Sequence, residues 1–229
     1  MPRYRVMYAK EGPARYLSHL DLIRTFDRAA RRAGLPVAFS QGFNPHPKLF
    51  FAAPLAVGTI GDAEFADMEL TGDVPAGIVA KALSDAMPEG LRLIEIRLVP
   101  DNLPALMAVV DRAAYSARAV LDDSLERETL EKAAADFLAM PEILVERRSK
   151  TGEKRMFDIK PGIFAMSAWI NNDIIGLLAE LKTGSSGNIR FEELIAAFMK
   201  CSGLRVRGNF EMRRKALYPN GKKDQEMLW

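Results

Sequence analysis

The residues with the most distinctive chemistry form a short polar loop between two predicted strands. The loop reads Ser40-Gln41-Gly42-Phe43-Asn44-Pro45-His46-Pro47-Lys48. Each proline fixes its own φ and biases the preceding residue toward extended backbone, so the two prolines restrain His46 from both sides, while Gly42 permits a positive φ. A restrained loop loses little entropy on binding, which predicts a recognition loop; a structural connector is the alternative. The candidate binding groups are Gln41, Asn44, His46, Lys48 and the ring of Phe43.

A row of arginines follows along a predicted helix over residues 19–33. Arg24, Arg28 and Arg31 are spaced i, i+4 and i+7, which places them along one side of a helix, and Arg32 adjoins them. Guanidinium groups bind phosphate oxygens in a bidentate manner. The row therefore favours a phosphate-binding face, with a solvated face paired to nearby carboxylates as the alternative.

Two histidines raise the question of catalysis. A metal-independent RNA-cleaving site needs a base, an acid and a cation beside the phosphate, and His19, His46 and Lys48 are the candidates for these roles. Nothing in the sequence places them together. Neither a P-loop, a G-x-G-x-x-G motif nor a G-x-S-x-G elbow is present. We therefore favour a protein that is not an enzyme and keep an endoribonuclease as the alternative.

The cysteine and histidine counts limit cofactors. Cys201 is the single cysteine and there are two histidines. An intrachain disulfide, a cysteine-based zinc site and an iron–sulfur cluster held by this chain alone are therefore excluded. We expect no metal and no cofactor.

A second group of basic residues lies near the end of the sequence. These residues occupy odd positions of a predicted strand and would line one of its faces, where they could follow an RNA backbone. They are Arg205, Arg207, Arg213 and Lys215.

The charge is unevenly distributed. Thirty-two Lys and Arg stand against 30 Asp and Glu, for a net charge of +2. Residues 3–48 contain nine basic and three acidic residues, whereas residues 62–146 contain eighteen acidic and seven basic ones. This asymmetry favours a polyanion as the partner of the N-terminal part.

The predicted elements follow the order β-α-β-β-α-β twice. The predicted strands include residues 37–40 in the first copy and residues 143–148 and 157–160 in the second. Ser18 is the expected N-cap of the first helix, with Asp21 in its first turn. The repeated order predicts an α+β protein of two tandem ferredoxin-like sandwiches. We expect the first domain over residues 1–104, the second over 105–218 and a polar tail over 219–229.

The sequence also bears on location. No segment reaches the ~18 uninterrupted apolar residues of a membrane span, and residues 1–10 lack a signal-peptide apolar region. Together with the single thiol, these features predict a cytoplasmic protein without membrane contact.

The motifs Ser18-His19-Leu20-Asp21 and Gly42-Phe43-Asn44-Pro45-His46-Pro47-Lys48 resemble those of a bacterial family, the radical SAM-linked proteins. The resemblance is densest over residues 5–58. Weaker later motifs are Phe157-Asp158-Ile159-Lys160-Pro161 and Arg213-Arg214-Lys215-Ala216-Leu217. Members of this family, a domain of unknown function, occur fused to or encoded beside B12-binding radical SAM proteins, often near ribonuclease E/G and ribosomal protein genes.

The resemblance implies a B12-binding radical SAM protein as partner. This chain cannot supply radical SAM chemistry itself, because three cysteines are needed for the cluster. We therefore expect an RNA-binding accessory protein that presents tRNA or rRNA to a radical SAM RNA-modifying enzyme. The alternatives are the endoribonuclease and a protein-binding adaptor without RNA contact.

Overall fold

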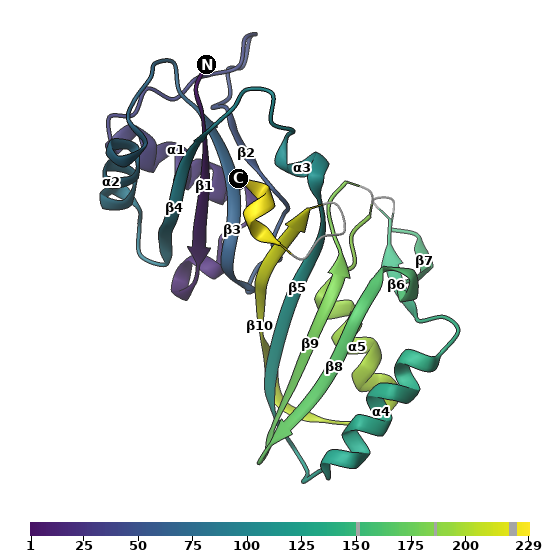
Figure 1. Ribbon diagram of the computed structural model, residues 1–229. Helices are drawn as coiled ribbons and strands as arrows, with labels where there is room; N and C mark the ends of the chain where they lie inside the picture. The colour runs from purple at the N-terminus through teal and green to yellow at the C-terminus, as the bar shows by residue number, and fades with distance from the viewer. Residues whose placement is uncertain (150–151, 186, 220–223) are drawn as a thin grey trace. The chain divides into compact units, whose positions relative to one another are not determined.

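The computed structural model describes residues 1–149, 152–185, 187–219 and 224–229. They form an α+β protein with a mixed sheet of eight strands and a separate two-stranded sheet (Figure 1). The chain divides into two compact units, one of Met1–Asp111 with Arg213–Trp229 and one of Arg112–Met212. Within the described residues, no helix combines the length and apolarity needed to cross a membrane. The predicted α+β class is confirmed.

The first unit begins with the predicted β-α-β-β-α-β order. Its elements are β1 (Arg3–Lys10), the 3-10 helix η1 (Gly12–Tyr16), α1 (His19–Arg32), β2 (Leu49–Phe51), β3 (Ile60–Glu69), α2 (Ala76–Ala86), β4 (Leu91–Val99), α3 (Leu106–Val109) and, near the end of the chain, η3 (Gln225–Leu228). The strands pair antiparallel in the order β4-β1-β3-β2. This order resembles the ferredoxin-like arrangement. The predicted strand over residues 37–40 is reduced to two isolated bridges, Val37↔Leu70 and Phe39↔Pro47.

The core of this unit lies between the sheet and two helices. Alternation along β1 places Tyr4, Val6 and Tyr8 on the face that α1 and α2 cover (Figure 1). On α1, Leu22, Phe26 and the two alanines Ala29–Ala30 recur at helical spacing and are buried. The apolar stripe of α1 thus faces the sheet, and its arginines are left on the outer side.

The second unit has the same underlying order with one insertion. Its elements are β5 (Val110–Leu121), α4 (Arg127–Ala139), β6 (Leu144–Arg148), β7 (Lys154–Asp158), the 3-10 helix η2 (Lys160–Gly162), β8 (Ile163–Asn171), β9 (Ile174–Lys182), α5 (Phe191–Ser202) and β10 (Val206–Pro219). The unit takes β5 from Arg112 on and β10 up to Met212. The main sheet runs β10-β5-β9-β8, again resembling the ferredoxin-like order. The predicted strands over 143–148 and 157–160 instead correspond to the separate hairpin β6–β7.

The C-terminal residues belong to the first unit, which differs from the predicted boundaries at 104 and 218. β10 pairs parallel with β3 through Arg213↔Ile60 and Arg214↔Gly61, and this pairing makes the sheet mixed. The predicted polar tail over 219–229 is also partly packed. Leu228 is fully buried, and the ring of Trp229 meets Phe65 at 5.4 Å between centroids. The apolar end of the segment explains this anchoring.

Two buried arginines form ion pairs between strands of the first unit. Arg214 joins β10 to β3, and Arg5 joins β1 to β3. The Arg214 guanidinium donates to both carboxylate oxygens of Glu64 and to the carbonyl oxygens of Ala53 and Pro54. Arg5 donates from Nε and Nη2 to the Asp67 carboxylate, at 2.7 Å each. Removing one partner of such a buried pair leaves an uncompensated charge, which costs about 3–5 kcal/mol.

We therefore expect Glu64→Gln to lower the free energy of unfolding by about 3–5 kcal/mol, because the buried Arg214 loses the charge of Glu64. Urea denaturation followed by circular dichroism measures the change. The control is Asp85→Asn, which removes the exposed ion pair with Lys81 on α2. Equal shifts of the urea midpoint in both variants would contradict the structural role of the buried pair.

Candidate nucleic-acid interface

Arg24 and Arg31 lie exposed along α1, and each pairs with a carboxylate on the same helix. Arg24 Nη1 is 3.3 Å from Asp21 Oδ1, and Arg31 Nε is 3.0 Å from Asp27 Oδ2. The two arginine side chains are 68% and 63% exposed. Ion pairs at such exposure are weak, so a phosphate can compete with the carboxylate for the guanidinium.

Arg28 and Arg32 are not neutralised in this way. Arg32 Nη2 donates to the carbonyl oxygen of Ala86 at 2.7 Å. Arg28 is exposed, and in the described part of the chain no acidic side chain pairs with it. The predicted row is therefore present, and Arg28 in the row and the adjoining Arg32 have no carboxylate partner in the described residues.

The first turn of α1 is fixed by the predicted cap. The Asp21 N–H donates to Ser18 Oγ at 3.2 Å, and Ser18 Oγ donates to Asp21 Oδ2 at 2.7 Å. The bond from the Ser18 hydroxyl, aided by Arg24, lowers the pKa of the Asp21 carboxyl. These contacts give Ser18 and Asp21 a structural role, which is to hold the start of the arginine row in place.

The loop over residues 40–48 is closed at its base. The Ser40 N–H donates to the His46 carbonyl at 2.9 Å, and the His46 N–H donates to Ser40 Oγ at 3.0 Å. Gly42 has a φ of +124°, a conformation that favours glycine. Residues 41–46 are exposed, with Phe43 fully so. The loop thus presents its polar side chains, Gln41, Asn44 and His46, together with the Phe43 ring.

The row and the loop meet at one contact. The Arg31 guanidinium lies 5.3 Å from the ring centroid of Phe39, which directly precedes the loop. A cation at this distance is attracted to the face of an aromatic ring. The structure therefore brings the C-terminal end of the arginine row beside the base of the loop.

Lys48 is less available than the other predicted contacts. Its Nζ lies 2.7 Å from Glu69 Oε2, and both side chains are partly buried. The negative charge of Glu69 offsets the positive charge of Lys48 that would attract a phosphate. Contact of Lys48 with phosphate stays a prediction.

The predicted catalytic candidates come from different segments of the first unit, with His19 on α1 and His46 and Lys48 between α1 and β2. The His19 ring packs edge-on against Phe51 at 5.6 Å between centroids, whereas His46 lies in the loop. No hydrogen bond or ring contact joins the two histidines in the described residues. The endoribonuclease alternative stays a prediction.

The C-terminal basic residues fall into two pairs. Arg213 and Lys215 both bind the Asp62 carboxylate, Arg213 Nη1 at 2.7 Å, while Arg214 between them points to the opposite, buried side. Arg205 and Arg207 belong to the second unit. Arg205 is exposed there, and Arg207 Nε lies 3.6 Å from Asp122 Oδ1.

The later motif at residues 157–161 organises the second unit. Asp158 Oδ1 accepts hydrogen bonds from the N–H groups of Ile143 and Lys160, at 2.9 and 3.0 Å. Lys160 Nζ donates to the carbonyl oxygen of Leu138 in the last turn of α4. Asp158 and Lys160 therefore tie the β6–β7 hairpin to α4.

Over the described ranges, no group of three or more His, Cys, Asp or Glu side chains is arranged to hold a metal ion.

A buried lysine near His19 was missed by sequence reasoning. Lys10 is buried and donates from Nζ to the carbonyl oxygen of Leu17 at 2.9 Å. Burial lowers the pKa of Lys10, and the Glu64 charge partly opposes this shift. The sequence gives little sign of this burial. The register of β1 against β3 shifts between Tyr8 and Lys10, so Lys10 departs from the simple alternation that the sequence suggests.

The surroundings of His19 make the stability of the chain depend on pH. Burial, and then the charge of Lys10, lower the pKa of the His19 imidazole from its ordinary value of about 6.5. The unfolded chain then binds the proton more tightly than the folded chain. As the pH falls through about 6.5, stability therefore declines, and the loss is complete below the pKa of His19 in the folded state.

We expect the ring-proton NMR titration of His19 to have its midpoint below that of histidine in a denatured sample of the same chain. The His19→Asn variant lacks the corresponding decline in stability. A His19 midpoint equal to or above the denatured value would show that the ring is not desolvated beside Lys10.

Comparisons with known proteins place the chain in context. A family model described as "Uncharacterized protein conserved in bacteria (DUF2344)" matches residues 3–191. No curated protein matches the chain at a significant level.

Among solved structures, a chain in the crystal structure of a Cbf5-Nop10-Gar1 complex is similar, with a TM-score of 0.55 and 12% identity. The similarity covers 93% of this chain and 48% of that one, so this chain spans about half the length of its match. An unknown protein from Galdieria sulphuraria and a putative glycine cleavage system transcriptional repressor each have 10% identity, with TM-scores of 0.25 and 0.24. Each of these two matches covers 96% of this chain and 98% of the other. The first similarity concerns the fold alone, and the other two carry no argument.

Proposed function

We propose that this chain, which belongs to the bacterial family DUF2344, is an RNA-binding accessory protein that presents RNA to a radical SAM enzyme. The observation that carries the proposal is the arginine row on α1, in which Arg28 has no acidic partner in the described residues. This row meets a closed loop that exposes an aromatic ring.

The row supplies the electrostatic part of RNA binding. Arg24, Arg28 and Arg31 recur along the outer side of α1, so they can contact successive phosphates of one strand. The carboxylates that pair with Arg24 and Arg31 are on the same helix and exposed or partly exposed. Phosphate contact therefore replaces weak ion pairs rather than buried ones.

The loop supplies the base contact. Phe43 projects from a backbone that is closed by the Ser40–His46 hydrogen bonds, so little order is lost when a base stacks on its ring. Stacking of a base on an aromatic side chain contributes about 1–3 kcal/mol and tolerates many sequences. The exposed residues Gln41, Asn44 and His46 are close to Phe43 in the sequence. They offer hydrogen-bonding groups to the same RNA strand.

The radical SAM partner rests on the sequence. The motifs at residues 18–21 and 42–48 resemble those of the radical SAM-linked proteins, and the single Cys201 cannot hold the required cluster. The exposed apolar side chains of the β6–β7 hairpin suit a protein contact. They are Leu144, Met156 and Phe157. In this proposal the first unit holds the RNA and the hairpin faces the partner enzyme.

We expect the chain to bind single-stranded RNA with an affinity that falls steeply as salt rises. The slope of log K against log salt is about −0.7 for each phosphate neutralised. Fluorescence anisotropy with labelled RNA between low and physiological salt measures it. The double variant Arg24→Gln/Arg31→Gln should bind several-fold more weakly with a shallower slope, because two phosphate contacts are lost.

The matched control is Arg127→Gln, which removes an exposed arginine from α4 of the second unit. It should leave both the affinity and the salt slope unchanged. RNA binding that is undetectable or independent of salt would overturn the proposed function.

A further inference from the structure

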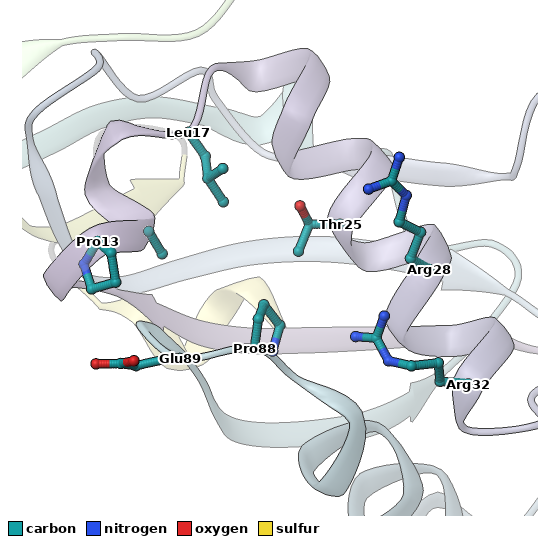
Figure 2. Close-up of a pocket in the computed structure, with 8 residues that line it drawn as sticks. Pro13, Leu17, Thr25, Arg28, Arg32, Pro88 and Glu89 are labelled. Atoms are coloured by element: carbon teal, nitrogen blue, oxygen red, sulfur yellow. The ribbon is translucent and has the colours of Figure 1, made fainter.

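A pocket of about 320 Å³ lies between η1, one side of α1 and the residues that precede β4 (Figure 2). All of its lining residues belong to the first unit. Its volume is near the lower end of the ~300–1,000 Å³ range of small-molecule sites, which suits one nucleotide rather than a longer segment.

One wall of the pocket is cationic. Arg28 and Arg32 are one turn apart on α1, and Figure 2 shows both side chains extending from the same side of the helix. Arg32 is held by its hydrogen bond to the Ala86 carbonyl, at 2.7 Å. Arg28 has no acidic partner in the part of the chain that the structure describes. Two guanidiniums at this spacing suit a phosphate group, which can accept from both.

The other wall is apolar and stiff. Pro13 and Leu17, within and just after η1, face Pro88 across the pocket. The prolines have a fixed φ, so this wall is ordered before a ligand arrives. A ribose or base can pack there while its phosphate reaches the arginines.

The two ends of the pocket differ in charge. Glu89 lies on the side opposite the two arginines, and Figure 2 shows its carboxylate directed away from them. A phosphate is therefore expected at the arginine end of the pocket. A terminal phosphate carries about −1.5 to −2 charges, which two guanidiniums match better than a single diester charge.

We propose that this pocket binds the 5′-phosphorylated terminal nucleotide of an RNA strand. The inference rests on the proposed function. It says that the pocket holds the 5′ end of the same RNA strand that the arginine row and the loop contact. The phosphate would lie between Arg28 and Arg32, and the nucleoside would pack on Pro13, Leu17 and Pro88.

The test compares one short single-stranded RNA with a 5′-phosphate or a 5′-hydroxyl end, by fluorescence anisotropy with a 3′ label. We expect the 5′-phosphorylated RNA to bind about tenfold more tightly to the wild-type chain, as for a charge-assisted contact. Arg28→Gln and Arg32→Gln should each remove most of this preference. Arg24→Gln, which lies outside the pocket, should lower the affinity for both RNAs equally and keep the preference for the 5′-phosphorylated RNA.

The controls separate this inference from the proposed function. Lys81→Gln on α2 should change neither affinity. If both RNAs bind equally well to the wild-type chain and Arg28→Gln weakens them equally, the pocket assignment is wrong while RNA binding stands. If neither RNA binds, the proposed function itself is wrong. If uridine 5′-monophosphate binds as tightly as the 5′-phosphorylated RNA, the pocket takes a free nucleotide and the RNA end is overturned as the ligand.

Discussion

Arg214 is a buried cation, and its charge has to be balanced inside the first unit. Glu64 on β3 provides the balance, and the carbonyl oxygens of Ala53 and Pro54 accept further hydrogen bonds from the same guanidinium. A Cβ at Gly61 would lie 2.6 Å from a side-chain carbon of Glu64, so glycine at this position leaves room for the carboxylate. Arg214 on β10, Glu64 on β3 and the segment after β2 are therefore held together by one buried interaction.

The same interaction sets the position of the proposed RNA surface. The segment that Arg214 holds follows β2 directly, and Phe51 at the end of β2 packs against Phe26 of α1 at 5.2 Å between ring centroids. The His19 ring covers another side of Phe51. α1 is thereby held against the sheet from its first turn, with its apolar stripe inward and its arginines outward. A rigid helix keeps the spacing between cationic groups that successive phosphates require.

The features that sequence reasoning predicted are those that depend on local spacing. The Ser18 cap, the arginine row and the closed loop over residues 40–48 each follow from neighbouring residues along the chain. The pairing of Arg214 with Glu64 could not be predicted, since 150 residues separate the partners and charged strand positions usually face water. The separate sheet formed by β6 and β7 was not predicted either, because alternation does not reveal which sheet a strand joins. The pocket beside Arg28 combines three separate segments and has no local signature.

The central claim is that the α1 and loop surface of the first unit contacts RNA. Ultraviolet crosslinking of the intact chain to RNA, followed by mass spectrometry of the crosslinked peptides, tests it most directly. The account predicts crosslinks at Phe43 and in the peptides that contain residues 24–32. Crosslinks confined to peptides of the second unit, residues 112–212, would contradict it.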